Sequence, residues 1–120
     1  MNQETRAWPT QLKVNHERNM LTVAFDTGQT YDLSAEMLRV MSPSAEVQGH
    51  SSDQRVTLGG KRQVLIVELQ PVGNYAVKIN FSDGHSTGLF TWSYLETLGR
   101  EKDERWAAYE TELADKQLQR

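Results

Sequence analysis

The stretch VGNYAVKINFSDGHSTGLFTWSYLETLG, residues 72–99, decides the fold class of this chain. Within it, residues 75–81 place large apolar side chains at every second position, which is the period of a strand with one buried face. Asp83 and Gly84 follow, and this pair is preferred in a two-residue type I′ hairpin turn. We therefore expect the chain to reverse there and to return as an antiparallel strand through residues 85–89.

A short helix is expected after this returning strand. Thr91 is a suitable N-cap, because its hydroxyl can accept a hydrogen bond from a backbone N–H of the first helical turn. Phe90 and Leu95 occupy the two positions of a hydrophobic staple, which fixes the direction in which the chain enters a helix. Gly99 predicts the end of the helix, since glycine is favoured just beyond a helix C-terminus.

The residues before this stretch predict short strands and a hairpin. Residues 12–14, 21–25 and 30–33 all alternate apolar and polar side chains, as half-buried strands do. Gly28 lies between the last two of these segments and can take the positive φ that many turns need. The pattern predicts a hairpin closed at Gly28 and preceded by a further short strand.

A second helix and an irregular connection follow this hairpin. Ser34 predicts an N-cap, and Pro43 predicts the end of the helix, because the residue before proline avoids the α conformation. Residues 42–61 are irregular, although residues 55–58 could form a short strand. The nearly continuous apolar run at residues 64–69 predicts a central strand. The apolar residues expected in the helix are Met37, Leu38, Val40 and Met41.

A last helix is expected to begin near Asp103. Trp106, Tyr109 and Leu113 fall at helical spacing and form one apolar stripe. We therefore expect this helix to pack on the rest of the domain. Two ion pairs at i,i+4 spacing should support it slightly, namely Glu101–Arg105 and Glu112–Lys116.

Strands and helices do not alternate along this chain, so a doubly wound parallel sheet is not expected. The order of elements favours an α+β fold, with an antiparallel-rich sheet of short strands and hairpins, short helices and a C-terminal helix. We divide the chain into a flexible N-terminal tail at residues 1–10, a domain at residues 11–99, and a C-terminal helix within residues 100–120 that packs on the domain.

Composition narrows the classes of function. The chain has 120 residues, a formal net charge of −3 and no cysteine. The acidic balance argues against a nucleic-acid binder, which would show a basic face, and the lack of cysteine excludes disulfides, thiolate metal sites and cysteine nucleophiles. No apolar run reaches the ~18 residues of a membrane span, and the first ten residues contain no apolar signal region. We expect a cytoplasmic protein that binds neither nucleic acid nor membrane.

Few residues point to a specific chemistry. No phosphate-binding loop is present, since Lys61 after two glycines lacks the rest of that motif. Glu46 and His50 are four residues apart, which suits two metal ligands on one helix face, but Pro43 and the intervening glycine disfavour a helix there. His85, directly after the Asp-Gly pair, could be a turn residue, a ligand, a hydrogen-bond partner of the preceding loop or a partner contact.

Two segments together resemble a known family. LRVMSPSAEVQGH, residues 38–50, and the opening stretch, residues 72–99, are similar to bacterial stand-alone members of the gamma-butyrobetaine hydroxylase-like N-terminal domain family. The similarity extends from about Leu12 to Gly99. In carnitine-pathway hydroxylases, the corresponding domain precedes the catalytic oxygenase barrel, which this chain is too short to contain. Related domains are also attached to iron–sulfur carrier proteins, which implies an accessory or docking role.

The resemblance implies a specific contact within the domain. The hydroxylase domains bind a structural zinc through three closely spaced cysteines and one distant histidine. On this sequence the cysteine positions fall at Ser42, Ser44 and Val47, and the histidine falls at His85. Serine and valine cannot replace thiolate ligands of zinc. The resemblance therefore implies that His85 lies near Ser42 and Ser44 without the metal.

Three hypotheses about function follow. The first is a non-catalytic accessory domain that binds no cofactor and contacts a protein, such as an iron–sulfur or oxygenase-related protein. The second is a small metal-binding protein in iron or iron–sulfur handling, with His85, His50 and Glu46 as candidate ligands. The third is an enzyme whose clustered carboxylates and histidine act in acid–base chemistry. The interaction surface proposed for the first hypothesis comprises Ser42, Ser44, Glu46, His50, Asp83, His85 and Trp92.

Overall fold

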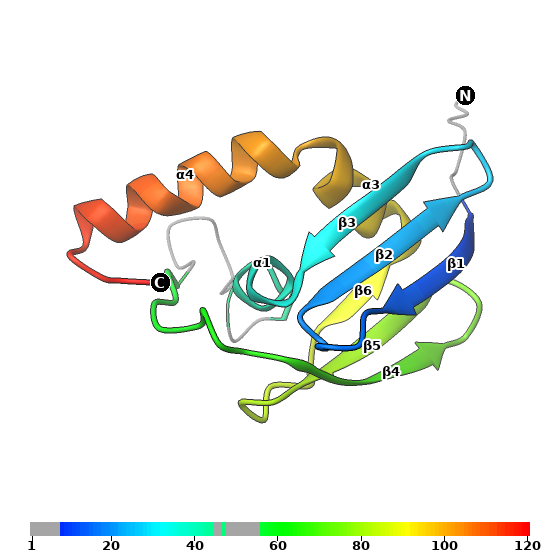
Figure 1. Cartoon of the computed structure of the whole chain (residues 1–120), viewed down its shortest axis with the longest axis horizontal. Helices are drawn as coiled ribbons and strands as arrows, with labels where there is room; N and C mark the ends of the chain where they lie inside the picture. Colours follow the sequence, from blue (N-terminus) through cyan, green and yellow to red (C-terminus); the bar gives the residue numbers. More distant parts are fainter. Residues whose placement is uncertain (1–7, 45–46, 48–55) are drawn as a thin grey trace.

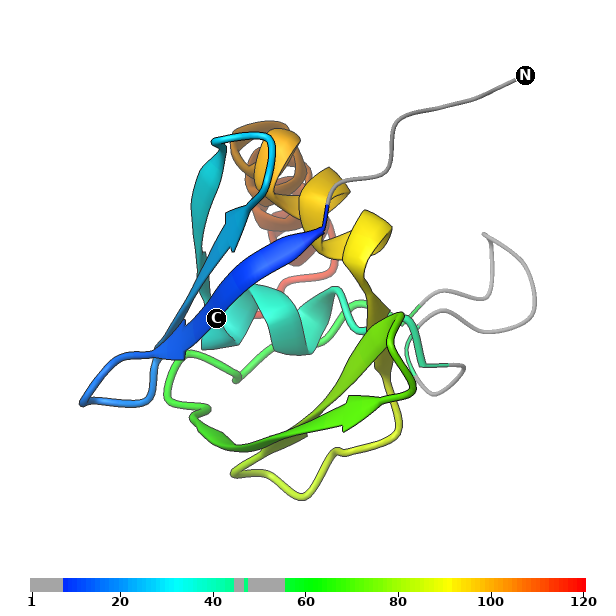
Figure 2. The ribbon, with the colours of Figure 1, turned by 90° about the vertical axis from the view of Figure 1, so that its right-hand side faces the viewer.

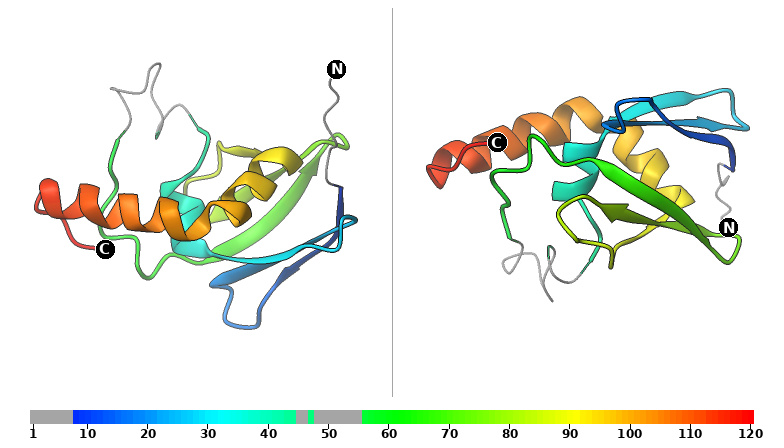
Figure 3. Two further views of the ribbon diagram at one scale, coloured as in Figure 1. Left: turned by 90° about the horizontal axis from the view of Figure 1, so that it is seen from above. Right: turned by 60° about the horizontal axis from the view of Figure 1, so that its bottom comes forward.

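The computed structural model describes residues 8–44, 47 and 56–120. These residues form two three-stranded antiparallel sheets with helix α1 (Ala35–Val40) between them (Figures 1 and 2). Helices α3 (Trp92–Arg100) and α4 (Lys102–Asp115) follow each other along one side of the molecule (Figure 3). The α+β class predicted from the sequence is confirmed, although the strands divide into two sheets.

The first sheet contains β1 (Pro9–Val14), β2 (Met20–Phe25) and β3 (Thr30–Ser34) in the order β1-β2-β3. Its buried face is formed by Leu21, Val23 and Leu33, as the alternation predicted. Strand β1 includes Pro9 and Thr10, which we had placed in the N-terminal tail. The pairing of Pro9 with Phe25 extends the strand, and a bulge follows it.

Helix α1 is buried on every side. The Ser34 hydroxyl accepts a hydrogen bond from the Met37 N–H at 3.0 Å, so the predicted N-cap is confirmed. All six residues of the helix are buried, including the charged Glu36 and Arg39. A buried charge must have a partner, and each of these two finds one in a distant part of the chain.

The second sheet contains β4 (Ile66–Val72), β5 (Ala76–Phe81) and β6 (Leu89–Thr91) in the order β4-β5-β6. Strand β4 therefore lies at an edge, and our prediction of a central strand at residues 64–69 was wrong. The apolar run alternates in space, since Ile66 is buried whereas Val67 is 53% exposed. The Arg18 guanidinium donates to the carbonyls of Ile66 and Val67 at 2.8 and 2.6 Å, and so covers part of this edge.

The turn after β5 is not the expected two-residue type I′ turn. A type I′ turn needs positive φ at both central residues, but only Gly84 of the Asp-Gly pair has it, at +93°. The Gly84 N–H donates to the Phe81 carbonyl at 3.0 Å, and the Phe81 N–H donates to the His85 carbonyl at 2.9 Å. This pattern is a three-residue loop that ends in a bulge. The Asp83 carboxylate also accepts from the His85 N–H at 3.1 Å, which holds the loop in this form.

Helix α3 begins as predicted but does not end at Gly99. The Thr91 hydroxyl accepts from the Tyr94 N–H at 3.1 Å, which confirms the N-cap. The helix continues to Arg100, and Gly99 is buried inside it. A Cβ atom at this position would lie 2.2 Å from Cγ of the Tyr31 ring. Glycine is therefore needed here because β3 and α3 approach closely, not because the helix stops.

Helix α4 packs on the domain through the stripe that the sequence predicted. Tyr109 and Leu113 are buried, and Trp106 is partly buried against the core. The Tyr109 hydroxyl donates to the Leu58 carbonyl, which ties the helix to the segment before β4. Residues 56–58 form no strand, contrary to the short strand suggested for this region, and Arg55 lies outside the described residues.

The last residues turn back toward α1. The Gln119 carbonyl accepts from the Gly60 N–H at 2.7 Å. The Arg120 guanidinium donates to both carboxylate oxygens of Glu36, at 3.1 and 2.8 Å, and its centre lies 5.1 Å from that of the Trp106 ring. The pKa of Arg120 is raised, chiefly by its hydrogen bond with Glu36. The buried carboxylate of α1 is thus paired from the C-terminal segment.

Trp106→Ala should lower the melting temperature. The ring is partly buried and lies 5.1 Å, centre to centre, from that of Tyr109. Losing this partial burial should cost about 1–2 kcal/mol, or roughly 5–10 °C in a chain of this size. Trp8→Ala is the control, since Trp8 is 48% exposed. Equal melting curves for both variants in thermal unfolding would contradict the packing role.

Candidate functional site

The segment 42–44 lies against the loop that follows β5. The Ser42 hydroxyl and Nε2 of His85 are 2.9 Å apart, and the Ser44 and Thr87 hydroxyls are 2.7 Å apart. The contact between His85 and Ser42 implied by the family resemblance is therefore confirmed. Either the ring or the hydroxyl can donate in the first of these hydrogen bonds, depending on the imidazole tautomer.

Gly88 makes this close approach possible. A Cβ atom there would lie 2.2 Å from Oγ of Ser42 and 3.3 Å from Cδ of Pro43. Any larger residue would push the 42–44 segment away from His85. Sequence reasoning missed this residue, because nothing in a single sequence distinguishes a glycine that permits a contact from one in an ordinary turn.

Asp83 forms the charged part of the same region. Its carboxylate oxygen Oδ2 accepts from Arg39 Nε at 2.7 Å and from Lys61 Nζ at 2.6 Å. Burial alone would raise the pKa of Asp83, but hydrogen bonds from Lys61, the His85 N–H and Arg39 lower it to about 2. Among the residues that the structure describes, the buried Nη1 atom of Arg39 has no hydrogen-bond partner. This cluster joins α1 to the loop after β5.

The structure brings together only part of the predicted interaction surface. Ser42, Ser44 and His85 are buried, with 0%, 7% and 6% exposure, so they lie inside the domain rather than on a contact surface. Trp92 lies at the other end of β5, where its indole N–H donates to the Asn74 carbonyl at 2.8 Å. Asp83 belongs to the charged cluster with Arg39 and Lys61. The other two residues of that surface, Glu46 and His50, lie outside the described residues.

The residues at the family's metal position do not fit zinc. Val47 is buried and carries no donor atom, and the two serines offer neutral hydroxyls that are already hydrogen-bonded. Zinc sites in proteins are built from thiolates, imidazoles and carboxylates, so His85 is the one suitable side chain at these four positions. Throughout the described part of the chain, no three His, Asp or Glu side chains are grouped so that they could hold a metal ion.

Restoring the cysteines should restore metal binding. We expect the triple variant Ser42→Cys, Ser44→Cys and Val47→Cys to bind about one zinc ion per chain, because three thiolates and His85 complete a tetrahedral set. The measurement is metal content by elemental analysis after dialysis. Adding His85→Ala should abolish tight binding. A folded triple variant without zinc would show that the four positions do not share the required geometry.

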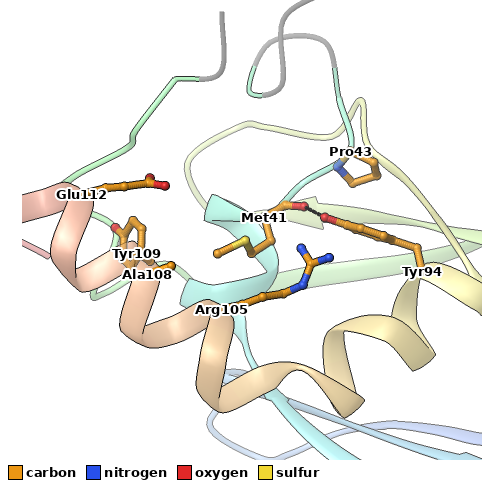
Figure 4. A pocket seen from close by; sticks show the side chains of 7 residues that line it. All are labelled: Met41, Pro43, Tyr94, Arg105, Ala108, Tyr109 and Glu112. Atoms are coloured by element: carbon orange, nitrogen blue, oxygen red, sulfur yellow. Dashed lines mark hydrogen bonds between the residues drawn. The ribbon is translucent and has the colours of Figure 1, made fainter. Parts of the chain in front are cut away.

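An open groove lies next to this hydrogen-bonded cluster. It has a volume of about 490 Å³ and separates α4 from the end of α1 (Figure 4). At one end the Tyr94 hydroxyl donates to the Met41 carbonyl at 2.5 Å, and the Arg105 guanidinium lies 5.9 Å from the Tyr94 ring centre. Glu112 stands at the other end. The lining residues are Met41, Pro43, Tyr94, Arg105, Ala108, Tyr109 and Glu112.

Sequence reasoning did not identify this groove. Tyr109 was interpreted as part of the apolar stripe of the last helix, and Arg105 only as the partner of Glu101, a pair that the structure confirms at 2.9 Å. The groove is formed by α3 and α4 together with residues 41–43, which lie far from these two helices in the sequence. Its one sequence signal is Ala108, a small residue on the same helix face as Arg105 and Glu112 at i,i+3 and i,i+4 spacing.

The contact between Ser42 and His85 is the one that the family resemblance implied, and a comparison with family models agrees with that resemblance. The family model for "gamma-butyrobetaine hydroxylase-like, N-terminal" matches residues 12–96. The chain belongs to this family. The match ends inside α3, so α4 with Tyr109, and Arg120, which pairs with Glu36, lie beyond the matched residues.

Several solved structures are similar to this chain in fold and in sequence. Two NMR solution structures are 44% and 41% identical to the chain, each with a TM-score of 0.84. They cover 97% and 100% of this chain, and the matches span 91% and 89% of those chains. A crystal structure from Acidithiobacillus ferrooxidans, described as a DUF971-family protein with unknown function, is 38% identical. It covers 76% of this chain and 91% of its own, with a TM-score of 0.63. No curated protein matches.

Across residues 8–44, 47 and 56–120, no helix is both long enough and apolar enough to cross a bilayer.

Proposed function

We propose that this chain is a non-catalytic accessory domain that binds a partner protein in the cytoplasm through the groove between α4 and residues 41–43. The observation that carries the proposal is a difference between two neighbouring regions, the hydrogen-bonded cluster around His85 and the groove beside it. The residues with chemical capability, Ser42, His85 and Asp83, are joined to one another or to other parts of the domain. The groove beside them offers a binding surface.

The pairing of Ser42 with His85 does not favour an enzyme. A serine nucleophile needs a base that is oriented by a third group and an open path for the substrate. Ser42 is fully buried. Asp83 accepts from the backbone N–H of His85, so this contact does not orient the imidazole ring. The arrangement is typical of a structural hydrogen bond that holds two segments together.

The partner proposed is a protein of the iron–sulfur or oxygenase-related class. The support is the family itself, which is described as gamma-butyrobetaine hydroxylase-like, N-terminal. In hydroxylases of the family, a domain of this kind and the catalytic unit belong to one chain. Here the domain would bind a catalytic unit that is a separate chain. This step is an analogy at the level of the family.

The test is to capture the partner by cross-linking in cells and then to measure binding between the two purified proteins by calorimetry. We expect a one-to-one complex with a dissociation constant in the micromolar range, roughly, as for transient assemblies. Ala108→Arg should abolish binding by filling the groove. Ala107→Arg is the matched control, because Ala107 is exposed on the same helix but does not line the groove.

Two results would count against the proposed function. One is the absence of any purified protein that binds directly. The other is a complex that both arginine variants form as well as the natural chain does, since the partner would then bind elsewhere.

A further inference from the structure

Arg105 gives the groove a chemical preference. Its Nε atom donates to Glu101 at 2.9 Å, and its guanidinium faces the Tyr94 ring at 5.9 Å. Within the described residues, the two terminal amino groups of Arg105 have no hydrogen-bond acceptor. A guanidinium has five N–H donors in a fixed planar arrangement, so most of this donor capacity faces the groove, as Figure 4 shows.

The position of this guanidinium is fixed before any ligand arrives. The ion pair with Glu101 and the contact with the Tyr94 ring restrain the long side chain, which is 31% exposed. A restrained donor loses little rotational freedom when it binds. The planar pair of amino groups matches the two oxygens of a carboxylate, which Arg binds in a bidentate manner.

The surface next to Arg105 is apolar. The Met41 side chain and the Pro43 ring face the same space, and Ala108 leaves room along α4 (Figure 4). Methionine adapts its shape to different apolar partners. A ligand that places a carboxylate on Arg105 would therefore also place an adjacent apolar group on Met41 and Pro43.

The other end of the groove has the opposite charge. Glu112 lies seven residues beyond Arg105, which corresponds to about 10 Å along a helix axis. Its carboxylate accepts a hydrogen bond from Thr57 at 3.2 Å. Arg105, at the opposite end, is therefore the groove residue whose chemistry suits a carboxylate of the ligand.

We infer that the groove binds an extended segment of the partner protein through one aspartate or glutamate side chain, seated on Arg105, and a neighbouring aliphatic side chain on Met41 and Pro43. This inference rests on the proposed function and specifies the chemistry of its partner. A peptide is favoured over a free small acid because the groove is open and runs along two turns of α4, so it can accept a chain that enters and leaves.

The experiment is an NMR titration of the full chain with capped pentapeptides. The probes are acetyl-Ala-Leu-Glu-Ala-Ala-amide, its Gln counterpart and sodium acetate. We expect the Glu peptide to shift the signals of Arg105 and Ala108 and to bind at least tenfold more tightly than the Gln peptide or acetate. Arg105→Gln should weaken binding of the Glu peptide at least tenfold. Arg100→Gln is the control and should leave it within twofold, because Arg100 does not line the groove.

Several results would overturn the inference. These are equal binding of the Glu and Gln peptides, no effect of Arg105→Gln, and no binding of the Glu peptide up to its solubility limit. Acetate binding as tightly as the peptide would identify a site for small acids instead. These outcomes do not by themselves contradict the proposed function. If Ala108→Arg prevents binding of the partner protein whereas Arg105→Gln does not, the partner still occupies the groove.

Discussion

Asp83→Ala is expected to lower the free energy of unfolding by roughly 3 kcal/mol, because it leaves a buried guanidinium without its counter-charge. The Arg39 side chain is only 10% exposed, and its hydrogen bond to Asp83 is 2.7 Å long. The variant also removes the acceptor for Lys61 and for the His85 N–H. Urea unfolding at neutral pH measures the effect.

A double variant separates the lost ion pair from a general disturbance of the loop. Replacing both partners, as Asp83→Ala with Arg39→Met, removes the uncompensated charge and should recover part of the lost stability. If the double variant is as unstable as the sum of the two single variants, the pair is not the cause.

The same carboxylate should make stability depend on pH at the acid end. The pKa of Asp83 is about 2 in the folded chain, against an ordinary value of 3.8. A lowered folded pKa stabilises the protein above the unfolded value, and this contribution is lost as pH falls from about 4 to about 2. The difference in stability between the natural chain and Asp83→Asn should therefore shrink over this interval, and a constant difference would refute the assignment.

Tyr109→Ala is expected to cost about 3–5 kcal/mol, as large-to-small changes of buried aromatic residues do. The residue is 1% exposed, although it lies on α4, beyond the part of the chain that the family model matches. Its ring belongs to the main core cluster, and its hydroxyl donates to the Leu58 carbonyl. Chemical unfolding should show a clear shift of the midpoint.

Tyr109→Phe is the companion variant, because it keeps the ring and removes only the hydroxyl. It should cost about 1 kcal/mol, the typical value of one hydrogen bond. If the alanine variant were no less stable than the phenylalanine variant, α4 would be an attachment on a core that is complete without it.

Local signals in the sequence predicted most of the elements. Thr91 and Ser34 were correctly placed as N-caps, because capping depends on neighbouring residues alone. Gly99 was misinterpreted, because the reason for glycine there is the Tyr31 ring, which comes from another strand. The edge position of β4 was also missed, since a run of apolar residues does not reveal how many strands flank it.

The sequence also predicted some contacts of the candidate site and missed others. The contact between Ser42 and His85 could be expected through the family resemblance, although the two residues are 43 positions apart. The partners of Asp83 could not, because Arg39 and Lys61 come from separate segments and meet only when the domain is assembled. The groove at Arg105 likewise combines residues 41–43 with the distant helices α3 and α4, so its shape is a property of the folded chain.

The burial of α1 has a consequence for how the chain folds. A six-residue helix is far too short to persist in water, because its nucleation is unfavourable and few hydrogen bonds follow. Both of its charged side chains depend on partners from the second half of the chain, Asp83 and Arg120. The helix can therefore form only when the two sheets close around it. We conclude that its backbone amides open to solvent exchange only with the whole molecule, which makes this short helix a reporter of global unfolding.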